Sequence, residues 1–135
     1  MIKTILVDDD FLVLQALETI LSVQDHIEVI GTGSDGQDAV ELYITHKPDL
    51  VLMDIRMEPT TGIEAAETIL KDFPDAKILF LTTFQDDEYI TKALSLGCRG
   101  YLLKQHIKGI LPAIDAVMNG QIVYDSTIEM PVKKT

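Results

Sequence analysis

The sequence predicts a three-layer α/β fold, in which a parallel sheet of five strands lies between two layers of helices. Five short apolar runs alternate with five stretches whose apolar residues recur at helical spacing, and this alternation is typical of parallel βα units. The run Leu50–Met53 is apolar throughout, as expected for a strand buried on both faces. Because crossovers between parallel strands are right-handed, we expect the chain to reverse once, giving the strand order 2-1-3-4-5.

The first strand is the apolar run Ile5–Val7, which ends at three consecutive aspartates, Asp8–Asp10. Phe11–Leu21 has helical spacing of apolar residues, and we expect Asp10 to cap this helix because aspartate is favoured at that position. The second strand, residues 27–33, is more polar than the others. We therefore expect it at an edge of the sheet.

The second and third helices begin and end at recognisable signals. Ser34–Gln37 has the spacing of a capping box and predicts the start of the second helix. That helix should end near His46, because Pro48 disfavours helical backbone in the residue before it. The third strand, Leu50–Asp54, and a loop over residues 56–61 come next. The third helix is predicted from apolar residues at helical spacing: Ile63, Ala66, Ile69, Leu70 and Phe73.

The fourth strand is residues 77–81, and the fifth is Gly100–Leu103. Between them, acidic residues 86–88 occupy the first turn of the predicted fourth helix, where they suit its dipole. Gly97 is expected to end that helix, since glycine accepts the left-handed conformation common after a last turn.

The last helix spans residues 107–117, and Pro112 is tolerable there only if it lies in the first turn. The tail, residues 121–135, has no clear periodicity. We therefore expect one domain over residues 1–120, followed by a linker or disordered C-terminal tail.

Polar residues follow four of the predicted strands where each leaves the core. They are Asp8 and Asp9 after the first strand, Asp54 after the third, Thr82 after the fourth and Lys104 after the fifth. In the order 2-1-3-4-5 the carboxyl ends of these strands border one crevice. Each residue alone is compatible with an ordinary helix cap or surface position, but their combination at the strand ends indicates a functional site.

Carboxylates that share one crevice remain ionised only beside a cation. An all-oxygen ligand set suits Mg²⁺, and Mn²⁺ is an acceptable substitute. Asp54 is then placed to attack a phosphorus atom and to form an acyl phosphate. Thr82 can donate a hydrogen bond to one phosphoryl oxygen, and Lys104 can pair with another.

Composition excludes several other classes of function. The formal net charge of −11 makes nucleic acid an unsuitable direct partner, because phosphate contacts need clustered lysine and arginine. The sequence has no secretory signal pattern and no apolar run of about 18 residues, so we expect no membrane partner. The single cysteine, Cys98, leaves no intrachain disulfide, which fits a cytoplasmic location.

These motifs resemble the receiver domain of bacterial two-component response regulators, with the similarity covering residues 2–120. The segments that carry the resemblance are Ile5–Asp10, Leu50–Met57, Leu81–Phe84 and Gly100–Lys104. The resemblance implies a flavodoxin-like (βα)5 sandwich and a sensor histidine kinase as partner. It implies no enzymatic activity beyond self-phosphorylation and self-dephosphorylation.

The resemblance also implies a role for each site residue. Asp54 is the phosphoacceptor for the kinase's phosphohistidine. Asp9, Asp54 and the backbone carbonyl of Arg56 bind Mg²⁺, with Asp8 helping through water. Thr82 and Tyr101 form a switch pair, in which the hydroxyl turns toward the phosphoryl group and the ring follows inward.

Within this family the chain looks like the NarL/LuxR-type branch, on the segments Asp54–Met57, Leu81–Phe84 and Tyr101–Lys104. That branch implies transcription regulation through a C-terminal helix-turn-helix domain, which would make the contacts to DNA. We expect this chain to be a truncated regulator that lacks the domain; the alternative is a stand-alone receiver acting by protein–protein interaction. The sequence does not decide whether phosphorylation makes a homodimer, nor the cognate kinase or target genes.

The chain departs from the family pattern at Glu58, where proline is usual, and at Gln105, which follows the lysine. Arg56 and Phe84 lie two residues past Asp54 and Thr82, beside the expected path of the hydrolytic water. We predict slow self-dephosphorylation because Phe84 would screen that water.

Two rival functions fit parts of the sequence. In a haloacid-dehalogenase-type phosphatase Asp8 would be the nucleophile, since Asp8–Asp10 matches the Asp-x-Asp pattern after a strand. The next residues do not match that family, and the phosphorylated aspartate distinguishes the two hypotheses. A flavodoxin-like cofactor binder would need a phosphate-cradling loop after the first strand, where the acidic residues would instead repel phosphate.

Overall fold

The computed structural model describes residues 1–83 and 86–125, so Phe84 and the segment 126–135 lie outside the described residues. The strands are β1 (Ile2–Val7), β2 (Ile27–Gly33), β3 (Leu50–Met53), β4 (Ile78–Thr82), β5 (Gly100–Leu103) and β6 (Val123–Tyr124). The helices are α1 (Phe11–Ser22), α2 (Gly36–His46), α3 (Gly62–Asp72), α4 (Asp87–Leu96) and α5 (Ile110–Met118), with a 3-10 segment η1 (Lys104–Gly109) before α5.

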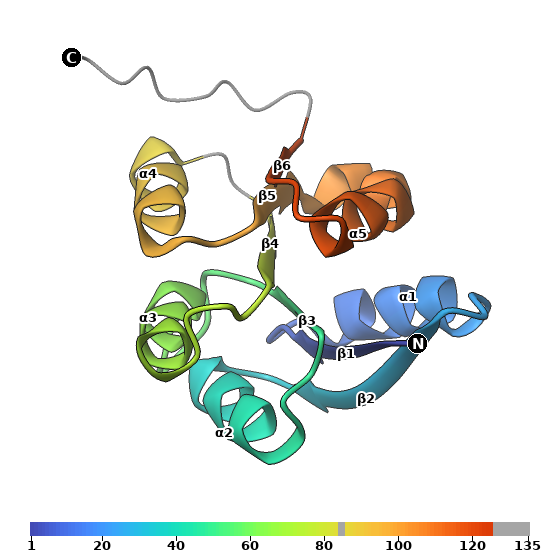
Figure 1. The fold of residues 1–135 in the computed structure, drawn as a ribbon, viewed down its shortest axis with the longest axis horizontal. Coiled ribbons are helices and arrows are strands. Elements are labelled where there is room, and N and C mark those ends of the chain that lie inside the picture. Colours follow the sequence, from blue (N-terminus) through green and yellow to red (C-terminus); the bar gives the residue numbers. More distant parts are fainter. Residues whose placement is uncertain (84–85, 126–135) are drawn as a thin grey trace.

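The strands form one parallel sheet in the order β2-β1-β3-β4-β5-β6 (Figure 1). The predicted order of the first five strands is confirmed, and β2 lies at an edge as its polar composition indicated. Strands are added to one side of β1 up to β2 and to its other side from β3 onward, so β1 and β3 pair directly, with Val7 opposite Met53. The residues that follow β1 and β3 are therefore neighbours at the carboxyl edge of the sheet.

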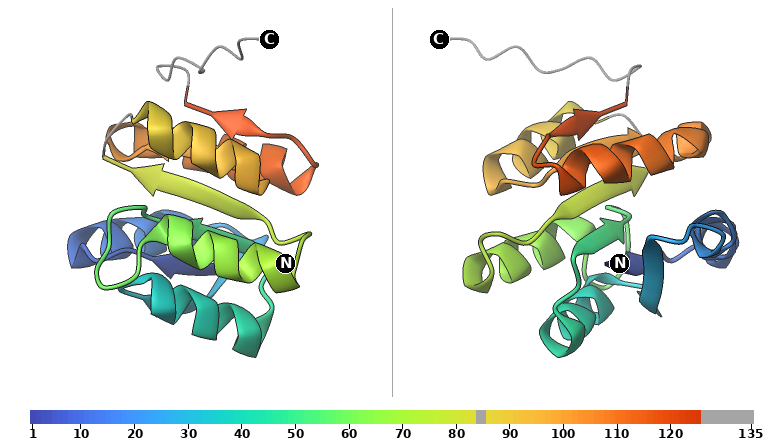
Figure 2. Two further views of the ribbon diagram at one scale, coloured as in Figure 1. Left: turned by 90° about the vertical axis from the view of Figure 1, so that its left-hand side faces the viewer. Right: turned by 45° about the vertical axis from the view of Figure 1, so that its right-hand side comes forward.

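Helices cover both faces of the sheet (Figure 2). On one face, Leu6, Leu52 and Leu81 of the strands pack in a cluster with apolar residues of α1 and α5. On the other face, Val7, Met53 and other strand residues pack with α2, α3 and α4. Alternate residues of each central strand thus point to opposite helix layers, which explains why these strands are apolar throughout.

The short strand β6 lies in the segment that we expected to be a linker or disordered tail. Val123 donates its backbone N–H to Arg99 at 2.9 Å, and Asp125 donates to Tyr101 at 3.1 Å. The buried Asp125 carboxylate accepts from the Leu103 N–H at 3.3 Å and lies 3.0 Å from His106 Nδ1. Within the described residues 121–125, Val123 and Tyr124 therefore join the sheet. A strand of two residues is too short to show the alternation of apolar and polar residues that would predict it.

The helix caps agree with the sequence at some positions and differ at one. Asp10 caps α1, as predicted, by accepting the Leu12 N–H at 3.0 Å. The capping box predicted from Ser34 is wrong, because Asp35 caps α2 by accepting the Asp38 N–H at 2.9 Å. Ser34 instead donates its own N–H to the Asp38 carboxylate at 2.9 Å, so the helix begins one residue later than the box requires.

The complete capping box lies at the start of α3. Glu64 donates its N–H to the Thr61 hydroxyl at 3.2 Å, and its side chain accepts the Thr61 N–H at 3.1 Å. Gly97 ends α4 with φ of 90°, as predicted. The last helix begins at Ile110 and not at Ile107, which belongs to η1. Pro112 is therefore the third residue of α5 and lies in its first turn, where a proline is tolerated.

Within residues 1–83 and 86–125, no helix combines the length and the apolar character that crossing a bilayer requires.

Cys98 lies in the core beneath α4 and is 2% exposed. Burial raises the pKa of its thiol to about 12. The unfolded chain releases the thiol proton at lower pH than the folded chain. The free energy of unfolding therefore falls as pH rises above the thiol pKa of the unfolded chain. We expect the free energy of unfolding of the wild type to fall relative to Cys98→Ala by about 2 kcal/mol between about pH 8 and about pH 10.5.

Urea unfolding of both proteins at the two pH values measures this difference. The Cys98→Ala variant is the control for the buried tyrosines, which lose protons in the same range. A difference that does not change with pH would show that folding leaves the thiol pKa unshifted.

Candidate functional site

Four strand ends bring polar side chains to one edge of the sheet, as predicted. Asp8 and Asp9 follow β1, Asp54 follows β3, Thr82 is the last residue of β4, and Lys104 follows β5. The Asp54 N–H donates to the Val7 carbonyl at 2.9 Å, which continues the β1–β3 pairing past the end of the strands. This bond places the Asp54 side chain beside those of the aspartates after β1.

The three aspartates form a cluster with the composition of a metal site. One carboxylate oxygen from each of Asp8, Asp9 and Asp54 lies within 4.8 Å of the others. Asp8 is 3% exposed and Asp54 is 6% exposed, whereas Asp9 is open to solvent. A hard divalent cation could therefore reach two buried carboxylates from the exposed Asp9 side.

Lys104 supplies the positive charge of this cluster. Its ammonium Nζ lies 2.8 Å from Asp8 Oδ2 and 3.3 Å from Asp54 Oδ2. The other oxygens are bonded to backbone amides: Asp8 Oδ1 accepts the Asp10 N–H and Asp54 Oδ1 accepts the Ile55 N–H, both at 2.8 Å. The buried carboxylates are thus held in fixed orientations by one ammonium and two amides.

Burial raises the pKa of the Asp8 and Asp54 carboxyl groups, and Lys104 opposes this rise in both. A neighbouring carboxylate adds to it, Asp54 acting on Asp8 and Asp9 acting on Asp54. Burial also lowers the pKa of Lys104, but its hydrogen bond to Asp8 and the charge of Asp54 more than offset that effect, so the net pKa is raised. The cluster has an excess of negative charge, which favours binding of a further cation.

The donor set fits Mg²⁺ or Mn²⁺, since it offers carboxylate oxygens and no nitrogen or sulfur ligand. Arg56, whose carbonyl the resemblance assigns to the metal, lies in the loop two residues past Asp54. Its side chain is exposed and its guanidinium carbon lies 5.7 Å from the centre of the Tyr89 ring.

Thr82 and Tyr101, the predicted switch pair, lie on the adjacent strands β4 and β5. Thr82 is 2% exposed, and the Tyr101 ring is fully buried, 6.5 Å from the Phe80 ring between centroids. Burial raises the pKa of Tyr101 to about 12, against a backbone hydrogen bond from Asp86 that lowers it. The aromatic ring is therefore already inside the molecule. Phe84, the predicted screen for water, lies outside the described residues.

The packing behind Asp54 is not indicated by any of the sequence motifs. Gly62 approaches the Asp54 backbone so closely that a Cβ at position 62 would collide with the Asp54 carbonyl oxygen. Gly62 also donates its N–H to the Ile55 carbonyl at 2.8 Å. A lone glycine at a helix start is the signal that could have indicated this approach.

A groove opens beside the aspartates on the side of the β3–α3 loop. It is lined by Asp9, Arg56, Met57, Glu58, Thr61 and Tyr89. The loop over residues 56–61 is tied to α2, because Gly36 donates its N–H to the Thr60 carbonyl at 2.9 Å. Since Asp9 is exposed and lines the groove, solvent and solutes have access to the carboxylate cluster from this side.

Residues 4–115 match the family model of the response regulator receiver domain. The transcriptional regulatory protein DesR of Bacillus subtilis (strain 168) is 42% identical over 125 residues, which are 92% of this chain and 62% of that protein. The transcriptional regulatory protein DegU of Brevibacillus brevis is 36% identical over 120 residues, 88% of this chain and 51% of that protein. The chain thus spans between 51% and 62% of the length of these relatives.

Among solved structures, the fold is similar to that of a LuxR-family two-component response regulator from Aurantimonas sp. SI85-9A1. The TM-score is 0.86 at 28% sequence identity, with 93% of this chain and 89% of that chain covered.

The close approach of Gly62 predicts the effect of a single methyl group. Gly62→Ala forces the loop away from the Asp54 carbonyl, and we expect a loss of about 2 kcal/mol of stability in urea unfolding. Gly109→Ala is the matched control, because a Cβ there meets nothing within 4 Å. Equal stabilities of the two variants would show that the loop has room to move.

The raised pKa of Asp54 predicts that its charge destabilises the metal-free protein. Above the unfolded value of 3.8 the folded chain retains the proton longer, so this group's contribution to stability falls as pH rises. We expect Asp54→Asn to increase the free energy of unfolding by about 1 kcal/mol near neutral pH. Lys104 keeps its partner Asp8 in this variant.

Urea unfolding without divalent cations, from about pH 4 to about pH 7, measures the gain, which should be smaller at the acid end. Asp25→Asn, at an exposed position, controls for the change in net charge. A variant less stable than wild type at every pH would contradict a raised pKa for Asp54.

Proposed function

Because the chain belongs to the response regulator receiver domain family, we propose that it accepts a phosphoryl group on Asp54 from the phosphohistidine of a sensor histidine kinase. The observation that carries the proposal is the arrangement at the strand ends. The Asp54 carboxylate lies beside the Lys104 ammonium, with two more carboxylates within 4.8 Å. This is a cation site joined to one buried nucleophile, the combination that phosphoryl transfer to a carboxylate needs.

Asp54 Oδ2 is the proposed nucleophile. The Ile55 N–H holds Oδ1 at 2.8 Å, which orients the carboxylate and leaves Oδ2 on the Lys104 side. Oδ2 forms a bond to phosphorus while the bond from phosphorus to the donor imidazole nitrogen breaks. The electron pair of that bond stays on the nitrogen, and the product is an acyl phosphate on Asp54.

Asp9, Asp54 and the Arg56 carbonyl would hold Mg²⁺ or Mn²⁺, with Asp8 acting through water. When bound, the ion supplies positive charge that offsets the negative charge of the phosphoryl oxygens. Lys104 bonds to both buried aspartates and is placed to pair with a phosphoryl oxygen once one is present. The Thr82 hydroxyl would donate to another oxygen.

The switch pair would act from a buried starting position. Thr82 and Tyr101 are both nearly or fully inaccessible, so a change on phosphorylation would move the Thr82 hydroxyl without bringing the ring in from solvent. Arg56 is placed to limit the access of water that hydrolyses the acyl phosphate, since it lines the groove beside Asp9. Phe84 is proposed for the same role on its sequence position alone.

The biological output is proposed from the relatives. Two of them are transcriptional regulatory proteins longer than this chain, so we propose that the domain controls a DNA-binding output domain that these residues do not include. A stand-alone receiver that acts by protein–protein interaction is the alternative. Homodimer formation on phosphorylation is compatible with both a DNA-binding output domain and a stand-alone receiver.

The test is the intact mass of the protein after incubation with acetyl phosphate and Mg²⁺. We expect one added phosphoryl group on wild type, none on Asp54→Asn, and none when a chelator removes the metal. Asp25→Asn is the matched control and should be phosphorylated like wild type, because it lies outside the site.

Reduction of the acyl phosphate with borohydride converts the modified aspartate to homoserine, which peptide mapping locates. Homoserine at position 54 supports the receiver mechanism. Homoserine at position 8 would support the phosphatase alternative, and an unmodified wild type would overturn both.

A further inference from the structure

Arg56 and Tyr89 make a contact at the mouth of the site that the proposed mechanism has not used. Arg56 lies in the loop after β3, and Tyr89 lies in the first turn of α4. The guanidinium carbon is 5.7 Å from the centre of the Tyr89 ring, within the range of about 6 Å in which a cation is attracted to an aromatic face. The contact thus links the phosphoacceptor loop to a helix on the far side of β4.

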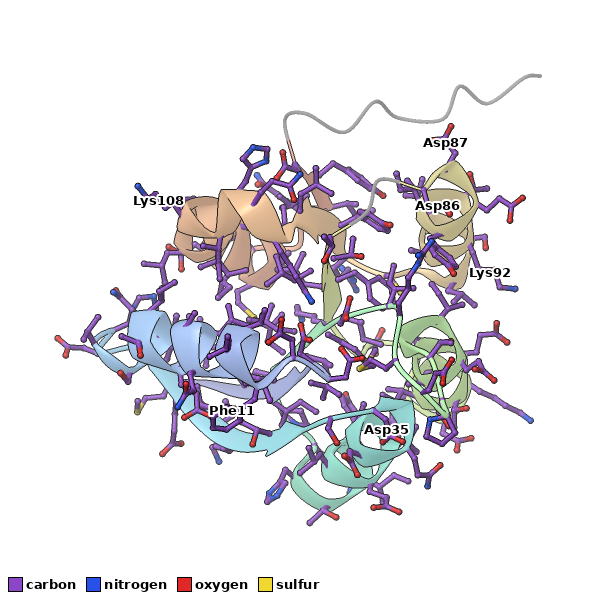
Figure 3. All side chains as sticks on the ribbon, turned by 180° about the vertical axis from the view of Figure 1, so that it is seen from behind. Phe11, Asp35, Asp86, Asp87, Lys92 and Lys108 are labelled. Atoms are coloured by element: carbon purple, nitrogen blue, oxygen red, sulfur yellow. The ribbon has the colours of Figure 1, made fainter. Side chains whose placement is uncertain are left out.

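Tyr89 stands on a helix end that is well fixed. Asp86 caps α4 by accepting the N–H groups of Glu88 at 2.9 Å and Tyr89 at 3.4 Å. Further along α4, Lys92 pairs with Glu67 of α3 at 3.4 Å; Figure 3 shows Asp86 and Lys92 on this helix. The ring is half-buried against the core, so it offers the exposed Arg56 side chain a fixed surface.

The contact matters because of the charge around the groove. Arg56 and Tyr89 line the same groove as Asp9, the exposed member of the carboxylate cluster. The chain has a net charge of −11, so an anionic phosphoryl donor is repelled by most of the surface. A guanidinium held at this groove places positive charge beside the exposed carboxylate of the cluster.

We propose that Tyr89 is a positioning residue that holds the Arg56 guanidinium at the mouth of the groove, where it attracts anionic phosphoryl donors to Asp54. The inference rests on the proposed phosphoryl transfer to Asp54. With acetyl phosphate, an Asp54 oxygen bonds to phosphorus, the bond from phosphorus to the acetate oxygen breaks, and acetate leaves with the electron pair. Arg56 remains charged throughout and transfers no proton.

The experiment compares initial rates of Asp54 phosphorylation by acetyl phosphate with Mg²⁺ at low ionic strength. We expect Tyr89→Leu to be about two- to fivefold slower than wild type, the factor that an exposed cation–π contact provides. Tyr89→Phe keeps the ring and should restore most of the rate. In an Arg56→Gln background, Tyr89→Leu should have no further effect, because the group it positions is absent.

Two further measurements separate this role from a general structural one. The loss in Tyr89→Leu should shrink as salt is added, since screening weakens the attraction. It should also be smaller with phosphoramidate, which carries less negative charge than acetyl phosphate. Lys92→Gln is the control for net charge. It removes one positive charge, as Arg56→Gln does, but from α4 and outside the groove, so it should change the rate less.

Several outcomes would overturn the inference. They are a wild-type rate in Tyr89→Leu, an equal loss in Tyr89→Phe, an undiminished loss in the Arg56→Gln background, and an equal loss in Lys92→Gln. Each of these presupposes a wild type that phosphorylates Asp54. A wild type that takes no phosphoryl group would instead overturn the proposed function, and this inference with it.

Discussion

The mutual repulsion of three carboxylates in one place is the constraint on which the rest of the site depends. Asp8 and Asp54 are almost fully buried and are brought together by the direct pairing of β1 with β3. Their carboxylates are held in place by the ammonium of Lys104, which directly follows β5, and by two backbone amides. One lysine does not neutralise three carboxylates, so the cluster at the end of the sheet keeps a net negative charge that favours binding of a cation.

The backbone around Asp54 is built to hold that carboxylate still. Gly62 lets α3 begin against the Asp54 carbonyl, and the capping box of Thr61 and Glu64 fixes the first turn of the helix. Gly36 then ties the same loop to α2 through the Thr60 carbonyl. In the proposed phosphoryl transfer, a carboxylate that is held in one orientation would lose little freedom when it reacts.

Most of the fold could be predicted from periodicity, because apolar runs of strand length alternating with helical spacing permit few parallel arrangements. The site followed from the same reasoning: Asp8, Asp54, Thr82 and Lys104 each end an apolar run, and parallel strands end on one side. The features missed were local. Asp35 rather than Ser34 caps α2, and β6 pairs with the sheet over only two residues. Neither the choice between two adjacent capping residues nor the pairing of a two-residue edge strand leaves a periodic signal in the sequence.

The sequence alone therefore determines which residue types stand at the strand ends and the chemistry available to them. Only the tertiary structure decides their distances: that Lys104 reaches both buried aspartates, that Gly62 lies against Asp54, and that the Arg56 guanidinium rests over Tyr89. Such contacts join segments far apart in the chain, and they depend on how helices settle against the sheet. Spacing in a sequence records the periodicity of one element at a time, whereas the meeting of two elements is set by packing.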